Sequence, residues 1–208
     1  MGAVGAIRPA EITEEAKKEM KSFLIRLKGI LVLPVVLLYK WLVNKEACAL
    51  IKADFSRWAA WQGKPRSVFG FSCLFAEYKE FRSVVYKRLG WRKAFLSWCL
   101  KGQDLLTLAC NDIGPGLIVQ HGYSTVVCAS KIGKNFHVNQ CVNIVWNGNQ
   151  QCRIGDNVTV CAGAIVVGGI TIGNNVVIGA GAVVVKDVPD HCVVVGNPMR
   201  IINKPPQP

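Results

Sequence analysis

Six consecutive hexads decide the fold of this chain: residues 154–189 read IGDNVT, VCAGAI, VVGGIT, IGNNVV, IGAGAV and VVKDVP. An aliphatic residue leads each hexad, and glycine or another small residue often follows it. A six-residue period fits neither an α-helix nor an alternating strand hairpin. It fits a triangular coil in which each hexad forms one flat side and one turn, so that three hexads close a coil. The leading aliphatic side chains then stack as a continuous internal ladder.

The same phase extends toward the N-terminus with two interruptions. Further hexads are led by Ile113, Val119, Ile132, Val138 and Ile144. One extra residue before Val126 shifts the phase, and the ten-residue gap between Ile144 and Ile154 extrudes four residues as a loop within residues 145–153. We therefore predict an α+β fold: a left-handed parallel β-helix of hexapeptide repeats, preceded by an α-helical N-terminal region.

The N-terminal half is predicted to be helical. Helices are expected from Glu14 to Lys28, from Asp54 onward, and from Tyr78 to Leu89, with Thr13 as a weak cap and Gly90 as a stop. The expected organisation has three parts. They are a basic helical and apolar segment (1–46), a helical region (47–105) and the β-helix domain (106–203).

Positive charge is concentrated in the N-terminal half. The formal net charge is +12, and residues 1–103 hold 19 Lys and Arg against 8 Asp and Glu. A basic N-terminal half of this kind could bind nucleic acid, an anionic membrane surface or an acidic substrate. Because no helix-turn-helix, zinc-finger or RNA-binding signature is present, no nucleic-acid partner is expected.

An apolar run of eleven uncharged residues, 29–39, lies inside this basic half. It is shorter than the ~20 residues that a spanning helix needs. Basic residues flank it: Lys21, Arg26 and Lys28 before, and Lys40 and Lys45 after. Two interpretations stay open, namely a peripheral or re-entrant anchor on an anionic bilayer and a contact between subunits.

The nine cysteines indicate a reducing compartment. None forms a C-x-x-C pair and no histidine has metal-ligand spacing from two of them, so no metal site is expected. They are interpreted as free, buried thiols. No secretory signal opens the chain, so the expected location is the cytoplasm, at the membrane if the apolar run binds lipid.

His121 is the candidate catalytic residue. It follows the inward Val119 by two residues, and the positions stacked on it one coil onward are Asn139 and Gln140. The other two histidines, His137 and His191, are expected to face solvent. An imidazole with a pKa near ~6.5 can take a proton from an alcohol that attacks a thioester. A nucleophilic Cys141 or Cys161 would lack a paired base.

Four segments carry a resemblance: GLIVQHG (116–122), IGKN (132–135), VVGGITIGNNV (166–176) and VGNPMRII (195–202). They resemble the serine acetyltransferase branch of the hexapeptide-repeat acyltransferases, over about residues 106–203. The resemblance implies acetyl-CoA as co-substrate, a homotrimer or dimer of trimers, and catalysis by His121. It also implies a cofactor groove lined by Ala162, Gly163, Gly179, Ala180, Gly181 and Ala182, with Lys186 near the nucleotide.

The sequence departs from that branch where the acceptor would bind. Gln120 replaces an acidic residue, Leu106 replaces the carboxylate that orients the histidine, and the Arg-His pair of the loop is replaced by Gln150 and Gln151. Asp104 and Asp112 are the nearby carboxylates. Amides and one aromatic ring suit a sugar, and the predicted acceptor-binding residues are Gln120, Asn139, Gln140, Trp146, Gln150 and Gln151.

These departures favour a hydroxyl of a surface or capsular polysaccharide as the acceptor. Two alternatives remain open. One is a serine O-acetyltransferase of cysteine biosynthesis, with a small-molecule acceptor. The other is a non-catalytic solenoid that serves as an assembly platform.

Overall fold

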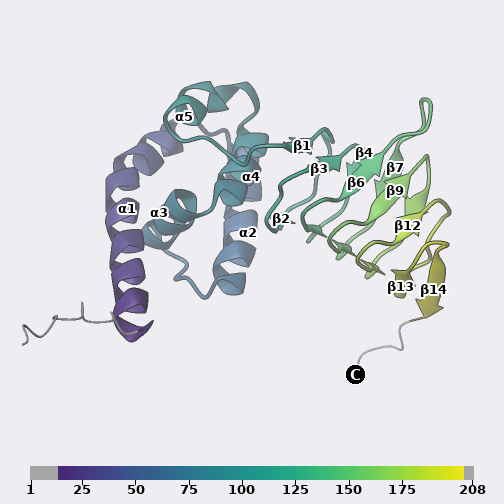
Figure 1. Cartoon of the computed structure of the whole chain (residues 1–208). Helices are drawn as coiled ribbons and strands as arrows, with labels where there is room; N and C mark the ends of the chain where they lie inside the picture. Colours follow the sequence, from purple (N-terminus) through teal and green to yellow (C-terminus); the bar gives the residue numbers. More distant parts are fainter. Residues whose placement is uncertain (1–13, 204–208) are drawn as a thin grey trace, which may run out of the picture.

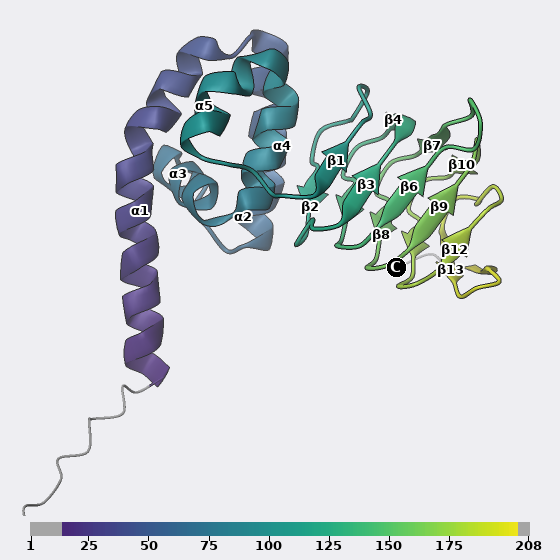
Figure 2. The same ribbon diagram turned by 45° about the horizontal axis from the view of Figure 1, so that its top comes forward.

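The computed structural model describes residues 14–203, as a helical region followed by a β-helix (Figure 1). The long first helix lies on the side of the helical region away from the β-helix, and the strands stack coil upon coil toward the C-terminus (Figure 2). The helices are α1 (Glu14–Leu42), α2 (Lys45–Trp61), α3 (Val68–Glu77), α4 (Lys79–Leu89), the 3₁₀ helix η1 (Gly90–Lys93) and α5 (Ala94–Cys99).

The β-helix has three faces of stacked short strands. The first face holds β1 (Leu106–Leu108), β3 (Thr125–Val127), β6 (Asn143–Val145), β9 (Ile165–Val167) and β12 (Val183–Val184). The second holds β4 (Ala129–Ile132), β7 (Cys152–Ile154) and β10 (Thr171–Ile172). The third holds β2 (Ile118–Val119), β5 (His137–Val138), β8 (Thr159–Val160), β11 (Val177–Ile178), β13 (Cys192–Val195) and β14 (Arg200–Asn203).

The pairing follows the hexads. Ile154 pairs with Ile172, and Val160 with Ile178, in parallel register. Ile144 pairs with Val166 across the extruded loop, so the four extra residues leave the ladder unbroken. The antiparallel pair β13–β14 closes the coil stack. The inward aliphatic side chains are almost fully buried and form one continuous core.

Two sequence expectations need correction. Val127, not Val126, points inward and is fully buried, because an irregular turn before β3 delays the phase by one further residue. The second helix begins at Lys45 rather than Asp54, since the Asn44 side chain accepts a hydrogen bond from Ala47 N and caps it there. The stop after Leu89 is confirmed by the left-handed Gly90, whereas Thr13 lies outside the described residues.

A buried ion pair fastens the helical region to the first coil. Asp54 of α2 is fully buried and accepts hydrogen bonds from Arg88 of α4 (2.9 Å) and from the backbone N–H groups of Gly116 and Leu117. Arg88 in turn donates to the Gly114 carbonyl. The two helices therefore satisfy main-chain groups of the coil's open end that would otherwise be buried without partners.

In the range 14–203 no helix is both long and apolar enough to cross a membrane. All nine cysteines are free thiols, as expected. The expectation that they are buried is wrong for Cys99 and Cys141, whose side chains lie on the surface.

Candidate functional site

The turns that follow the strands of the third face stack along one edge of the β-helix. Backbone bonds set the stacking: Gln120 N donates to Val138 O (2.8 Å), Asn139 N to Val160 O (3.0 Å) and Cys161 N to Ile178 O (2.8 Å). We call this column the His121 edge. It comprises residues 120–124, 139–142, 161–164 and 179–182.

His121 projects from a bulge on this edge. The turn between β2 and β3 has two more residues than the turns stacked beyond it, because Gln120 aligns with Asn139 and Ser124 with Cys141. His121 has φ 61°, and its side chain is exposed. Within residues 14–203 the imidazole has no hydrogen-bond partner. An exposed imidazole without a protein partner is free to exchange a proton with a bound ligand.

Within residues 14–203, no carboxylate forms a hydrogen bond or ion pair with His121 that would orient it. A Cβ atom on Gly122 would lie 3.5 Å from Leu106 Cδ2, so Leu106 sits beside the bulge as an aliphatic side chain. Asp112 pairs with Lys131 (3.3 Å) and Asp104 with Lys79 (3.5 Å). The two candidate carboxylates therefore contact lysines.

Asn139 and Gln140 lie on the His121 edge, one coil beyond the bulge. Their side-chain oxygens, Oδ1 and Oε1, are buried and have no hydrogen-bond partner in the described chain. Buried polar atoms are normally satisfied. Two unmet acceptors next to a free imidazole therefore indicate a place where a donor from a ligand or a neighbouring subunit binds.

A hollow of about 420 Å³ borders the same edge on the first face of the β-helix. Its lining includes Ser124 and Cys141, which are turn residues of the His121 edge, together with Leu105, which precedes β1, and the strand residues Thr107, Val126 and Asn143. No formal charge lies among these residues. The hollow is suited to a small neutral group near His121.

His137 does not lie where the sequence predicts, and it contacts Gln120, a predicted acceptor-binding residue. His137 does not face solvent: its ring packs edge-on against Trp61 (centroids 5.6 Å apart), and its Nε2 lies 3.2 Å from Gln120 Oε1. The sequence could not show this, because Trp61 belongs to α2. Gln120 is thus engaged by a structural partner. Burial, reinforced by nearby Arg57, lowers the pKa of His137 to about 4.

This pKa predicts an acid-sensitive fold. The folded value of about 4 lies below the ordinary 6.5, so protons favour the unfolded chain. Stability should be complete above about pH 6.5 and fall as the pH drops toward 4. Because the ring is only partly buried, we expect a loss of about 1–2 kcal/mol.

Urea unfolding of the His137→Gln variant at about pH 7 and about pH 4.5 measures this contribution. The variant should lose about 1–2 kcal/mol less than the unmodified protein between the two pH values. His191→Gln, at an exposed histidine, is the matched control and should change nothing. Parallel losses in all three proteins would contradict the assignment.

The extruded loop lies at a different edge from His121. It joins β6 of the first face to β7 of the second, whereas His121 joins the third face to the first. Trp146 is 56% exposed, and Gln150 packs over Gly169 of the next coil. Gln151 is half-buried. One protomer therefore does not bring Trp146, Gln150 and Gln151 to His121.

Most of the predicted cofactor residues do lie on the His121 edge. Gly163 and Gly181 occupy its turns with φ 70° and 66°, and Ala162, Gly179 and Ala180 flank them. Two corrections apply. Ala182 is fully buried and points into the core, and Lys186 lies beyond β12 at the next edge.

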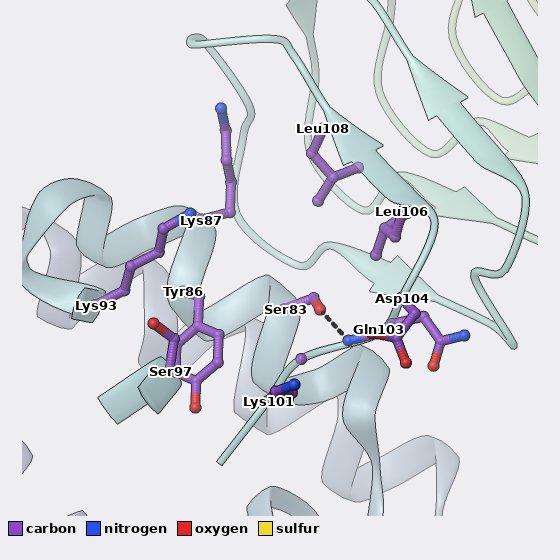
Figure 3. A pocket seen from close by; sticks show the side chains of 11 residues that line it. Ser83, Tyr86, Lys87, Lys93, Ser97, Lys101, Gln103, Asp104, Leu106 and Leu108 are labelled. Carbon is purple, nitrogen blue, oxygen red and sulfur yellow. Dashed lines mark hydrogen bonds between the residues drawn. The ribbon is translucent and has the colours of Figure 1, made fainter. Parts of the chain in front are cut away.

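A separate cationic cavity of about 380 Å³ lies where the helical region meets β1 (Figure 3). Lys87, Lys93 and Lys101 line it together with Asp104, which pairs with Lys79, and Leu106 and Leu108 form an opposite wall. Burial lowers the pKa of Lys87. The nearby Cys110 thiol raises it by a smaller amount, and the cations Lys93 and Arg88 lower it further. Sequence reasoning missed this cavity because its residues come from α4, η1, α5 and β1. Among residues 14–203 there is no group of three side chains that could hold a metal ion.

Comparisons with known proteins point to one kind of enzyme. Residues 151–186 match the bacterial transferase hexapeptide (six repeats) family. The serine acetyltransferase of Staphylococcus xylosus is 40% identical over 98 residues, which is 45% of each chain. The chain spans less than half the length of the curated relatives that it matches.

Solved structures are similar over more of the chain. The soybean serine acetyltransferase complexed with serine is 26% identical, with a TM-score of 0.60, and the match covers 76% of this chain and 70% of that one. A serine acetyltransferase in complex with CoA is 20% identical, with a TM-score of 0.61 over 87% of this chain and 83% of that one. These likenesses confirm the predicted fold, a left-handed parallel β-helix behind N-terminal helices, and the resemblance to the serine acetyltransferase branch.

Proposed function

We propose that this chain is an acetyl-CoA-dependent O-acetyltransferase with His121 as the general base. The observation that carries the proposal is the free imidazole of His121, which projects from the same β-helix edge that carries the small-residue coils. An acceptor hydroxyl would give its proton to the imidazole while its oxygen attacks the thioester carbonyl. The tetrahedral adduct would then break its C–S bond, and the CoA thiolate would leave and take the proton from the imidazolium. The thioester is already activated, so no covalent enzyme intermediate is required.

The partners of the reacting atoms would come from the same edge. Backbone N–H groups and the Asn139 and Gln140 side chains would stabilise the tetrahedral oxyanion. The amides would do so with their NH₂ groups, which are donors, while their unmet oxygens would accept a hydrogen bond from the acceptor or from a neighbouring subunit. The coils of Gly163 and Gly181 would let the CoA arm approach the backbone closely. The relative solved with CoA supports acetyl-CoA as the co-substrate.

A homotrimer is proposed because one protomer holds only part of the site. His121 and the loop of Trp146 and Gln150 lie at different edges. Packing three β-helices side by side would place the loop of one subunit against the His121 edge of the next. The unsatisfied oxygens of Asn139 and Gln140 support a contact there. A dimer of such trimers is the larger assembly that the resemblance implies.

The relatives make the hydroxyl of L-serine the first candidate acceptor. The sequence alone favoured a polysaccharide hydroxyl as the acceptor and left L-serine as an alternative. A specific observation favours a second candidate, the hydroxyl of a glycan. Serine carries an ammonium and a carboxylate that need charged partners in a desolvated cleft, and the His121 edge holds no Lys, Arg, Asp or Glu.

The cationic cavity bears on the acceptor as well. It shares Leu106 and Gln103 with the surroundings of Gly122, so it lies near the His121 bulge. A phosphate or carboxylate group of the acceptor could bind there, about Lys87, while its hydroxyl faces His121. This arrangement supports an acceptor with an anionic part, which both a phosphorylated glycan precursor and L-serine, through its carboxylate, provide.

The test is a competition between acceptors. The protein is mixed with acetyl-CoA, L-serine and a panel of sugars and sugar phosphates, and the products are identified by mass spectrometry. The proposal predicts free CoA and an O-acetylated product in equal amounts. O-acetyl-L-serine would assign the reaction of the relatives, and an O-acetylated sugar would assign the second candidate. Absence of any product from the whole panel would favour the assembly-platform alternative.

A further inference from the structure

The first helix has an apolar face that the rest of the described chain, up to residue 203, leaves exposed. On one side, α1 packs against α3 through Gly29, Val32 and Val36, and Ser72 donates a hydrogen bond to the Gly29 carbonyl. Large apolar side chains that are 43–69% exposed occupy the opposite side: Met20, Phe23, Leu24, Leu27, Ile30, Leu31 and Leu37. Their spacing of three and four residues places them on one helical stripe. A patch of this kind marks an interaction surface.

Cations lie beside this stripe. A cleft of about 650 Å³ between α1 and α3 is lined by Lys18, Lys21, Arg26 and Lys64, with Ile25, Ile30 and Phe69 as apolar lining. Its one carboxylate, Glu77, pairs with Lys64 (3.4 Å). In the described residues, no ion pair engages Lys18, Lys21 or Arg26. Ile30 lines the cleft and also belongs to the apolar stripe, so the unpaired positive charge of the cleft adjoins the stripe at this flank of α1.

The apolar stripe and the adjacent cations together indicate which kind of partner this surface binds. Helix α1 has six Lys and Arg against three Glu, and the acidic residues are confined to its first two turns. A second copy of this face would bring the same cations together, which opposes pairing. An anionic bilayer offers acyl chains for the stripe and phosphate groups for the cations. Since no described helix can span a membrane, the contact would be interfacial.

We propose that the outward stripe of α1, with the adjacent cationic cleft, docks on the surface of an anionic lipid bilayer. The helix would lie in the plane of the interface, with Phe23, Leu27 and Leu31 among the headgroups and upper acyl chains. The β-helix extends from the other side of the helical region, so the His121 edge would remain in water (Figure 1). This surface is independent of the proposed reaction.

Liposome flotation of the full chain tests the proposal. The probes are vesicles of phosphatidylcholine with phosphatidylglycerol and vesicles of phosphatidylcholine alone. The chain should float with the anionic vesicles, and much less with the neutral ones. The double variant Leu27→Glu/Leu31→Glu should lower the partition coefficient at least tenfold. Lys21→Gln/Arg26→Gln should lower it several-fold and reduce its dependence on salt.

Ile202→Glu is the matched control, since Ile202 is 52% exposed on β14 at the far end of the molecule. It should float like the unmodified protein, and circular dichroism melts should show all variants folded. Equal flotation of the Leu27→Glu/Leu31→Glu variant would overturn the proposal. A fall in molar mass of this variant by light scattering, without any vesicle binding by the unmodified chain, would assign the stripe to a second copy instead.

Discussion

Replacing His121 with Asn is expected to lower acetyl-transfer turnover by ~10²–10⁴ while leaving the KM for acetyl-CoA within a few-fold. Asparagine is the informative replacement because it adopts the left-handed backbone conformation (φ 61°) that this position requires. The turn would therefore keep its shape. The asparagine amide cannot take the proton from the hydroxyl of the acceptor. Only the rate of the chemical step should therefore fall.

His191→Asn is the matched control for this prediction. His191 is exposed, also has a positive φ (59°), and lies at a different edge of the β-helix. The turnover of the His191→Asn variant should stay within about twofold of that of the unmodified protein. Initial rates of CoA release at saturating acetyl-CoA measure both variants. Turnover retained in His121→Asn would place the base elsewhere.

Replacing Asp54 with Asn is expected to cost about 3–5 kcal/mol of unfolding free energy. The carboxylate is fully buried, contacts Arg88 at 2.9 and 3.2 Å, and accepts the N–H groups of Gly116 and Leu117. The neutral amide would leave the Arg88 cation buried without a counter-charge. It would also turn one acceptor into a donor that faces other donors.

Urea denaturation at fixed protein concentration measures this loss. The control is Asp104→Asn, which breaks an exposed ion pair with Lys79 and should cost less than about 1 kcal/mol. A similar small loss for Asp54→Asn would show that the helical region does not depend on this pair. Because Asp54 fastens α2 to the first coil, we also expect hydrogen exchange to speed up first in α2 and α4.

The hexads predicted the β-helix well because packing of the core imposes the six-residue period directly. Each coil must return an aliphatic side chain to the core, so Ile154, Ile172 and their neighbours reveal the register without any tertiary information. The prediction failed where the coil is irregular. The turn at His121 has two extra residues, whereas counting hexads predicted one. The inward residue is therefore Val127 and not Val126.

The candidate site was predictable only in part. His121, Asn139 and Gln140 share an edge because turns at matching positions of successive coils stack. The same counting places Trp146 and Gln150 on another edge, so the expectation that they join His121 needs a neighbouring subunit. The burial of His137 under Trp61 and the lysine cavity around Lys87 depend on how separate helices meet the β-helix. No local pattern in the sequence encodes those contacts.

The central claim is that His121 drives transfer of an acetyl group from acetyl-CoA to a hydroxyl. The most direct test is the rate of CoA thiol release, with and without a hydroxyl acceptor, for the unmodified protein and for His121→Asn. The account predicts release that rises with acceptor concentration in the unmodified protein and falls to the acceptor-free rate in the variant. Release that is independent of every acceptor, and equal in the two proteins, would contradict it.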